Sequence, residues 1–138
     1  MVVFIADRLS KGLVVAGIAP GHEKQVLPHV WLTNTHNSGA AFGIAPAGAG
    51  FFLLASAAVA VALVVYVVRN PLSLYTSTEL GLVMGGTLGN GYDRLFHGSV
   101  TDFIALHFWP IFNLADSAIS IGVTALMVGY LIRPKQPA

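Results

Sequence analysis

The feature that most constrains this chain is an apolar run over residues 50–68 that holds no charged residue and ends at Arg69. A helix needs about 20 mainly apolar residues to cross the hydrocarbon core of a bilayer. A second such run, 114–132, carries only Asp116, near its start. These two runs predict transmembrane helices, so the chain is expected to be an integral membrane protein.

The composition agrees with that expectation. Only 9% of the 138 residues are charged and 55% are hydrophobic, whereas a soluble domain has roughly 25% charged residues. The formal net charge of +1 provides no basic surface for nucleic acid. Cysteine is absent, which excludes disulfides, thiol nucleophiles and thiolate metal ligands. The length predicts a single domain, residues 1–138.

Two further segments, 79–96 and 1–18, predict the other helices of a four-helix membrane protein. Thr76 and Glu79 have capping-box spacing and mark the start of the first of these. The segment 1–18 holds Asp7 and Lys11, which are spaced to pair on one helix face as a structural ion pair. Its charges lie in the middle rather than at the front, which favours a retained helix over a cleavable signal peptide.

Four spans place both termini on one side of the membrane. Arg69, Arg133 and Lys135 lie on that side, which indicates that the termini are cytoplasmic. The outer side then receives residues 19–49 and 97–110. The β-forming residues of 30–35 predict a small extracytoplasmic β-rich region between the first and second helices. The expected fold class is therefore an all-α membrane protein with four transmembrane helices and this small addition.

Glycines recur at positions 81, 85 and 89, which on a helix form one smooth stripe. Such a stripe allows another helix to approach closely. The neighbouring glycine-rich run 85–91 lacks the Lys-Ser/Thr ending of a phosphate-binding loop. We therefore interpret these glycines as packing residues.

The aspartates are the candidate catalytic residues. A lone ionised carboxylate in a membrane segment costs free energy, so such a residue is normally paired with another group and often has a function. Asp93 has Arg94 beside it, but no Lys or Arg lies between Arg94 and Arg133 to pair with Asp102 or Asp116. In the topology above, Asp102 and Asp116 can meet at the outer membrane boundary. Two adjacent carboxylates share a proton, as the acid and base of aspartic proteolysis do. The alternative is that each acid only pairs with a base.

Other chemistries fit less well. The histidines show no metal-binding helical spacing, and no G-x-S-x-G motif or plausible Ser/Lys pair is present. A proton-coupled transporter would need a polar path through the bilayer, and the run 50–68 offers no ionisable group. A non-catalytic helical scaffold would leave Asp102 and Asp116 unexplained.

Three segments, in order, resemble the lipoprotein signal peptidase (signal peptidase II) family. Residues 37–43 (NSGAAFG) match its Asn-x-Gly-Ala-Ala-Phe box. Residues 85–94 (GGTLGNGYDR), followed by Val100 and the Asp102-Phe103 pair, resemble its G-G-x-x-G-N-x-x-D-R…V-x-D-F stretch. Residues 110–117 (PIFNLADS) match its P-x-F-N-x-A-D-S box. Asp7 and Lys11 also resemble family residues, whereas Arg8 and Thr101 stand where Gln and Val are usual.

The resemblance implies an aspartic endopeptidase, multi-pass in the bacterial inner membrane, with its site on the periplasmic side. The implied enzyme removes signal peptides from diacylglyceryl-modified prolipoproteins and cuts before the lipidated cysteine. Asp102 and Asp116 are the implied catalytic pair, and which one is the base stays open. The implied substrate-binding residues are Asn37, Asn90, Arg94 and Asn113. The implied structural support comes from Asp93, Asp7 and Lys11.

No metal or organic cofactor is implied by this resemblance. The expected partners are the lipid-modified prolipoprotein and the membrane lipids, with no nucleic acid. The protein is expected to act as a monomer.

Overall fold

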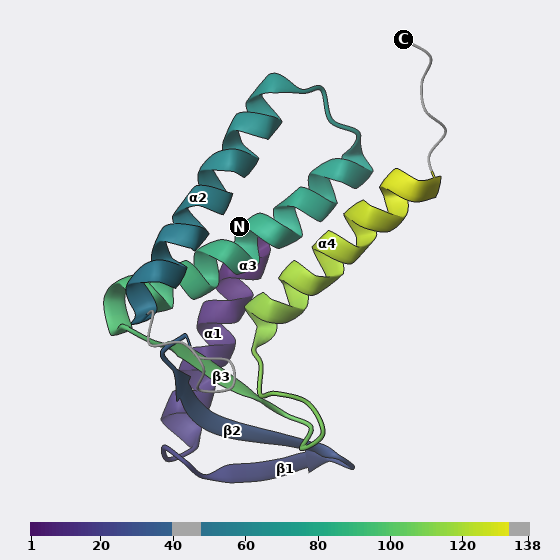
Figure 1. Ribbon diagram of the computed structural model, residues 1–138. Coiled ribbons are helices and arrows are strands. Elements are labelled where there is room, and N and C mark those ends of the chain that lie inside the picture. Colours follow the sequence, from purple (N-terminus) through teal and green to yellow (C-terminus); the bar gives the residue numbers. More distant parts are fainter. Residues whose placement is uncertain (40–47, 133–138) are drawn as a thin grey trace.

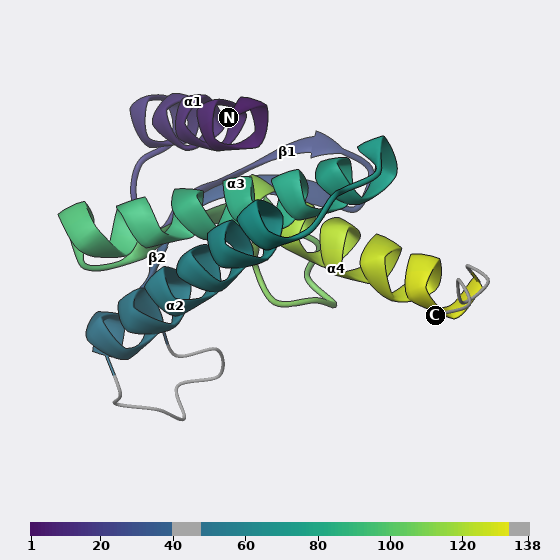
Figure 2. The ribbon, with the colours of Figure 1, turned by 90° about the horizontal axis from the view of Figure 1, so that it is seen from above.

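Helix α3 (Leu74–His97) is the central helix and packs against α1 (Val2–Gly17), α2 (Gly48–Arg69) and α4 (Leu114–Ile132) (Figure 1). The view from above places α1 on one side of α3 and α2 on the other (Figure 2). The computed structural model describes residues 1–39 and 48–132. Residues 40–43 of the first sequence box and the basic tail residues Arg133 and Lys135 lie outside these ranges.

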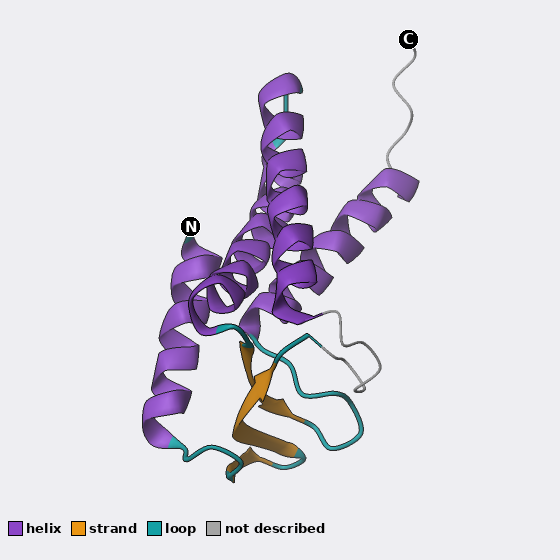
Figure 3. Cartoon of the chain, turned by 60° about the vertical axis from the view of Figure 1, so that its left-hand side comes forward, coloured by secondary structure: helices purple, strands orange, loops and turns teal. Residues whose placement is uncertain are grey.

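A small antiparallel sheet lies at one end of the helices (Figure 3). Its strand order is β1 (Glu23–Leu27), β2 (Val30–Asn37) and β3 (Val100–Ala105). The first two strands confirm the β-rich region predicted between the first two helices. Strand β3 was not predicted; it follows α3 and pairs with β2, so it brings a segment from late in the chain to the end of α1.

Helix α3 begins earlier than the sequence indicated. The predicted start relied on Thr76 and Glu79, but the helix begins at Leu74 and its N-cap is Ser73. The Ser73 hydroxyl oxygen accepts a hydrogen bond from the Thr76 backbone N–H at 3.1 Å, which is the usual N-cap contact. The helix ends at His97, and Gly98 is its C-cap, with a φ of 72° that suits glycine.

Two helical segments are long and apolar enough to cross a membrane, namely Gly50–Arg69 and Leu114–Ile132. The most apolar stretch of the first segment has no buried residue. In the most apolar stretch of the second segment, 22% of the residues are buried inside the protein. Their large side chains, such as Leu54, Val61 and Tyr130, face outward. Helix α1 has only 16 residues and includes Asp7, Arg8 and Lys11. Neither α1 nor α3 is both long and apolar enough to match this description.

The interior holds many polar side chains beside a small hydrophobic core. Among the described residues, the largest fully buried side chains are all polar: Lys11, Asn34, Asn113, Asp7 and Asp93. Buried polar groups require partners because an unpaired one costs free energy. Lys11 contacts both Asp7 and Asp93. Lys11 and Asn113 both donate to Asn90 Oδ1, so four of these five groups gather in one place.

Candidate active site

Strand β3 carries Asp102, whose side chain is buried with 3% of its surface exposed. The neighbouring strand β2 supplies Asn37, whose Nδ2 donates to Asp102 Oδ2 at 3.1 Å. Asn37 is itself oriented by the backbone N–H of Gly39, which donates to Asn37 Oδ1 at 2.9 Å. The pairing of two strands thus fixes one oxygen of the Asp102 carboxyl.

Asp116 is positioned by the first turn of α4. Asn113 precedes the helix, and its Oδ1 accepts the backbone N–H of Asp116 at 2.9 Å. In return Asp116 Oδ2 accepts the backbone N–H of Asn113 at 3.2 Å. This reciprocal pair is a capping box built from Asn and Asp. The carboxyl of Asp116 is therefore held at the N-terminus of a helix and is partly exposed.

Asn113 connects the two carboxyl groups. Its Nδ2 donates to Asp102 Oδ1 at 2.6 Å, while its backbone N–H donates to Asp116. The same Nδ2 also lies 3.2 Å from Asn90 Oδ1. Asn113 is fully buried, so one buried residue donates hydrogen bonds to both Asp102 and Asp116.

Asn90 and Arg94 approach the same place from α3. Asn90 Nδ2 donates to Asp116 Oδ1 at 2.7 Å. The Arg94 guanidinium lies over the Phe52 ring at 5.3 Å, and its Nη1 donates to the backbone oxygen of Asn90 at 3.5 Å. Asn37, Asn90, Arg94 and Asn113 are therefore gathered around the two carboxyl groups by β2, α3 and α4.

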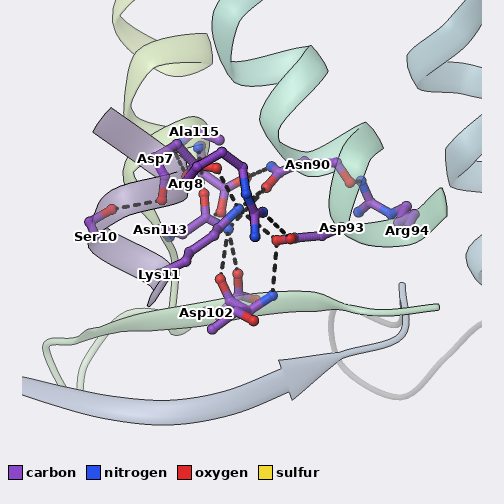
Figure 4. A network of polar contacts seen from close by, with 12 residues as sticks. Asp7, Arg8, Ser10, Lys11, Asn90, Asp93, Arg94, Asp102, Asn113 and Ala115 are labelled. Carbon is purple, nitrogen blue, oxygen red and sulfur yellow. Dashed lines mark hydrogen bonds and ion pairs between the residues drawn. The ribbon is translucent and has the colours of Figure 1, made fainter. Parts of the chain in front are cut away.

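A buried ionic cluster supports this arrangement from α1 (Figure 4). Lys11 Nζ lies 2.8 Å from Asp7 Oδ2 and 2.8 Å from Asp93 Oδ2, and it donates to Asn90 Oδ1 at 3.0 Å. The predicted ion pair between Asp7 and Lys11 is confirmed. Asp7 also accepts the backbone N–H of Ala115 at 3.1 Å, so α1 holds the start of α4 next to Asp116.

The ion-pair partners of Asp93 within the described residues do not include Arg94, its neighbour in the sequence. Its ion-pair partners among the described residues are Arg8, Lys11 and His97. Arg8 also stacks on Tyr92 at 4.6 Å from the ring centroid. The contact between Arg8 and Asp93 joins residues 85 positions apart, so no local pattern could reveal it. In the sequence, Arg8 stands out only as a departure from the family pattern.

Replacing Lys11 with Met should strongly destabilise the fold. The change leaves Asp7 and Asp93 buried, at 0% and 1% exposure, without their shared cation. Removing one partner of a buried ion pair costs about 3–5 kcal/mol. Thermal unfolding in detergent should show a large drop in Tm, whereas Lys24→Met on the exposed strand β1 should leave Tm unchanged. An equal Tm for both variants would contradict the role assigned to the cluster.

Burial raises the pKa of Asp102 to about 6, and the negative charge of Asp116 adds to this rise. Hydrogen bonds from Asn37 and Asn113 and the charge of Lys11 act in the opposite direction. Asp102 therefore keeps its proton to a higher pH than an ordinary aspartate. One protonated and one ionised carboxyl side by side can act as acid and base in hydrolysis.

No group of three or more His, Asp or Glu side chains within residues 1–39 and 48–132 is arranged to hold a metal ion. His29 and His107 have positive φ angles, and His107 stacks on Trp31 with ring centroids 3.8 Å apart.

Comparison with known proteins identifies the family. A family model described as signal peptidase (SPase) II matches residues 1–132. A lipoprotein signal peptidase of Syntrophomonas wolfei is 41% identical over 137 residues, covering 99% of this chain and 92% of that protein. One of Gloeobacter violaceus is 42% identical, covering 91% of this chain and 75% of that protein.

Solved structures agree with this relationship. A bacterial membrane enzyme determined by the in meso method at 2.3 Å has a TM-score of 0.86 and 31% identity, covering 99% of this chain and 89% of that one. A second, at 1.9 Å, has the same TM-score and 33% identity, covering 96% and 89%. The four helices and the three-stranded sheet are therefore the fold of a known membrane enzyme, and this chain belongs to the signal peptidase II family of lipoprotein signal peptidases.

Proposed function

We propose that this protein is a membrane-embedded aspartic endopeptidase that removes signal peptides from diacylglyceryl-modified prolipoproteins, cutting before the lipidated cysteine. The observation that carries the proposal is the bridge formed by Asn113 between Asp102 and Asp116. Family membership supplies the substrate class, because the relatives are lipoprotein signal peptidases. Residues 1–138 act as one peptidase domain.

In the proposed reaction, Asp102 and Asp116 activate a water molecule that attacks the scissile carbonyl. Arg94 and Asn37 flank the two carboxyl groups and hold the substrate backbone. Asn90 and Asn113 line the same pocket and keep the carboxyl groups in position. Holding reactants in a productive geometry can lower a barrier by several kcal/mol. Asp7, Lys11 and Asp93 support the site from behind.

The lipid anchor of the substrate fits the location of this site. We infer that all four helices cross the bacterial inner membrane, with the site at its periplasmic boundary and the apolar side chains of α2 and α4 in contact with lipid. Asp116 lies in the first turn of α4, so the site lies where that apolar helix begins. The acyl chains of the substrate can then stay in the bilayer while its peptide reaches the carboxyl groups. We also propose that the enzyme acts as a monomer.

The experiment that tests this function compares two substrates. Purified protein is mixed with a diacylglyceryl-modified prolipoprotein and, separately, with the same precursor lacking the lipid. We expect cleavage of the lipidated form only, with the new N-terminus at the modified cysteine. Cleavage of both forms at equal rates would contradict the proposed specificity, and cleavage of neither would contradict the proposed function.

A further inference from the structure

Resting on this proposed function, a further assignment concerns an aromatic side chain of α2 that lies outside the three sequence boxes. We propose that Phe52 is a positioning residue for the peptidase reaction, whose ring holds the guanidinium of Arg94 where that group binds the substrate backbone. Three features support this role: the direction in which Phe52 leaves α2, the free donors of Arg94, and the packing of the ring against Gly39.

Two phenylalanines follow one another near the start of α2, and they face different surroundings. Phe51 has 60% of its surface exposed, whereas Phe52 is half-buried on the side of α2 that packs against α3. Successive helical residues point in different directions, although these two rings touch edge to face with centroids 5.3 Å apart. Only the Phe52 ring therefore faces the candidate active site.

The guanidinium of Arg94 lies over the ring of Phe52. Arg94 Cζ is 5.3 Å from the ring centroid, which is within the range of a cation–π interaction. Arg94 follows Asn90 by four residues on α3, so the two side chains leave the same face of that helix. Asn90 in turn donates to Asp116 Oδ1 at 2.7 Å. The ring thus contacts the guanidinium on the face of α3 that reaches the carboxyl pair.

Hydrogen bonds within the described part of the chain do little to orient this guanidinium. Arg94 has five N–H donors, and its contact with the backbone oxygen of Asn90 is long, at 3.5 Å. Its Nε is buried without a hydrogen-bond partner among the described residues, and Arg94 takes part in none of the ion pairs between them. Its donors are therefore available to peptide carbonyl groups, and the Phe52 ring is the contact that sets their direction.

The Phe52 ring is itself held by Gly39, two residues after β2 ends. A Cβ on Gly39 would lie 2.5 Å from Phe52 Cδ2, so the ring packs directly against backbone that only a glycine leaves open. The N–H of Gly39 donates to Asn37 Oδ1, and Asn37 donates to Asp102. One ring therefore contacts both the segment that orients Asp102 and the guanidinium of Arg94, which fixes their relative positions.

Cleavage of a lipidated prolipoprotein by Phe52→Leu tests this role. Leucine keeps an apolar side chain in the same place but has no ring face for a cation, so kcat/KM should fall about tenfold. Phe52→Tyr keeps the ring face and should remain within about threefold of the wild type. The matched control is Phe51→Leu, which loses a ring from the adjacent exposed position and should change kcat/KM by less than about twofold.

A double-mutant cycle with Arg94→Gln separates positioning from simple packing. The cycle measures the affinity for the lipidated precursor in Asp102→Asn protein, so that no turnover is needed. Phe52→Leu should weaken this affinity about fivefold when Arg94 is present. In the Arg94→Gln background the ring has no cation to hold, so the same change should have an effect of less than about twofold.

Equal losses of affinity in both backgrounds would show that the ring only packs α2 against α3, and would overturn the proposal. A kcat/KM for Phe52→Leu equal to that for Phe51→Leu would overturn it as well. The proposed function fails separately, because a wild type that cleaves neither precursor loses the peptidase function. The affinity cycle would then still report whether Phe52 acts through Arg94.

Discussion

Asp102→Asn and Asp116→Asn, made separately, should each lower the rate of cleavage of a lipidated prolipoprotein by about 10³-fold or more. General acid–base groups typically contribute about 10²–10⁴-fold to a rate, and here each variant disables a pair that works jointly. An Asn side chain fills the same space and can still accept a hydrogen bond from Asn113. The protein should therefore remain inserted and folded while its activity is lost.

The matched control for these variants is Glu23→Gln. Glu23 is also an acid of the sheet region, but it lies on the exposed strand β1 and contacts His107 at 3.1 Å. Its replacement should leave the cleavage rate within twofold or so of the wild type, because exposed ion pairs contribute little. Near-normal cleavage by either aspartate variant, with Glu23→Gln measured in the same membranes, would refute the proposed mechanism.

The helices and the short hairpin could be predicted because their signals are local. The run 50–68 has no charged residue, and 30–35 is rich in β-forming residues. The capping box at α4 was also readable, since Asn113 and Asp116 have the right spacing directly before an apolar run. The family resemblance implies only substrate binding for Asn113, and its contacts with both carboxyl groups appear only in the structure.

The remaining contacts depend on pairings between distant segments. Strand β3 is only a short stretch after α3, and its position is decided by β2, which lies more than sixty residues earlier. The ion pairs of Asp93 with Arg8 and Lys11 depend on α1 packing against α3. A neighbour in sequence such as Arg94 is the simpler candidate, yet successive helical residues point in different directions. Only the packed structure shows which cation reaches the carboxylate.

The contacts of the α3 glycines also could not be deduced from their spacing in the sequence alone. The predicted stripe 81, 85 and 89 is only partly a contact surface. A Cβ on Gly85 would lie 2.7 Å from Val3, and one on Gly89 would lie 2.6 Å from Asp7 Oδ2, so both face α1. Gly81 has nothing within 4 Å of such a Cβ. Gly86, outside the stripe, makes the closest approach to α4.

Gly86→Ala should therefore cause the largest loss of stability among the glycine variants of α3. Its Cβ would lie 2.4 Å from the backbone oxygen of Ala115 and 2.7 Å from Ile119 Cγ1. Backbone atoms cannot rotate away, so α3 and α4 must separate. Inserting an extra methyl group into a packed interior costs about 1–3 kcal/mol, and sometimes more. Thermal unfolding in detergent should show the drop in Tm.

The same variant should also lose activity at temperatures where it is still folded. Ala115 is adjacent to Asp116, so any shift of α4 moves one carboxyl group relative to Asp102. A displacement of about 1 Å can cost about 10²-fold in rate. Gly81→Ala, on the same helix but with open space around it, should keep full activity, and its stability should rise by up to about 1 kcal/mol. If the two variants behaved alike, the close packing of α3 against α4 would not be what positions Asp116.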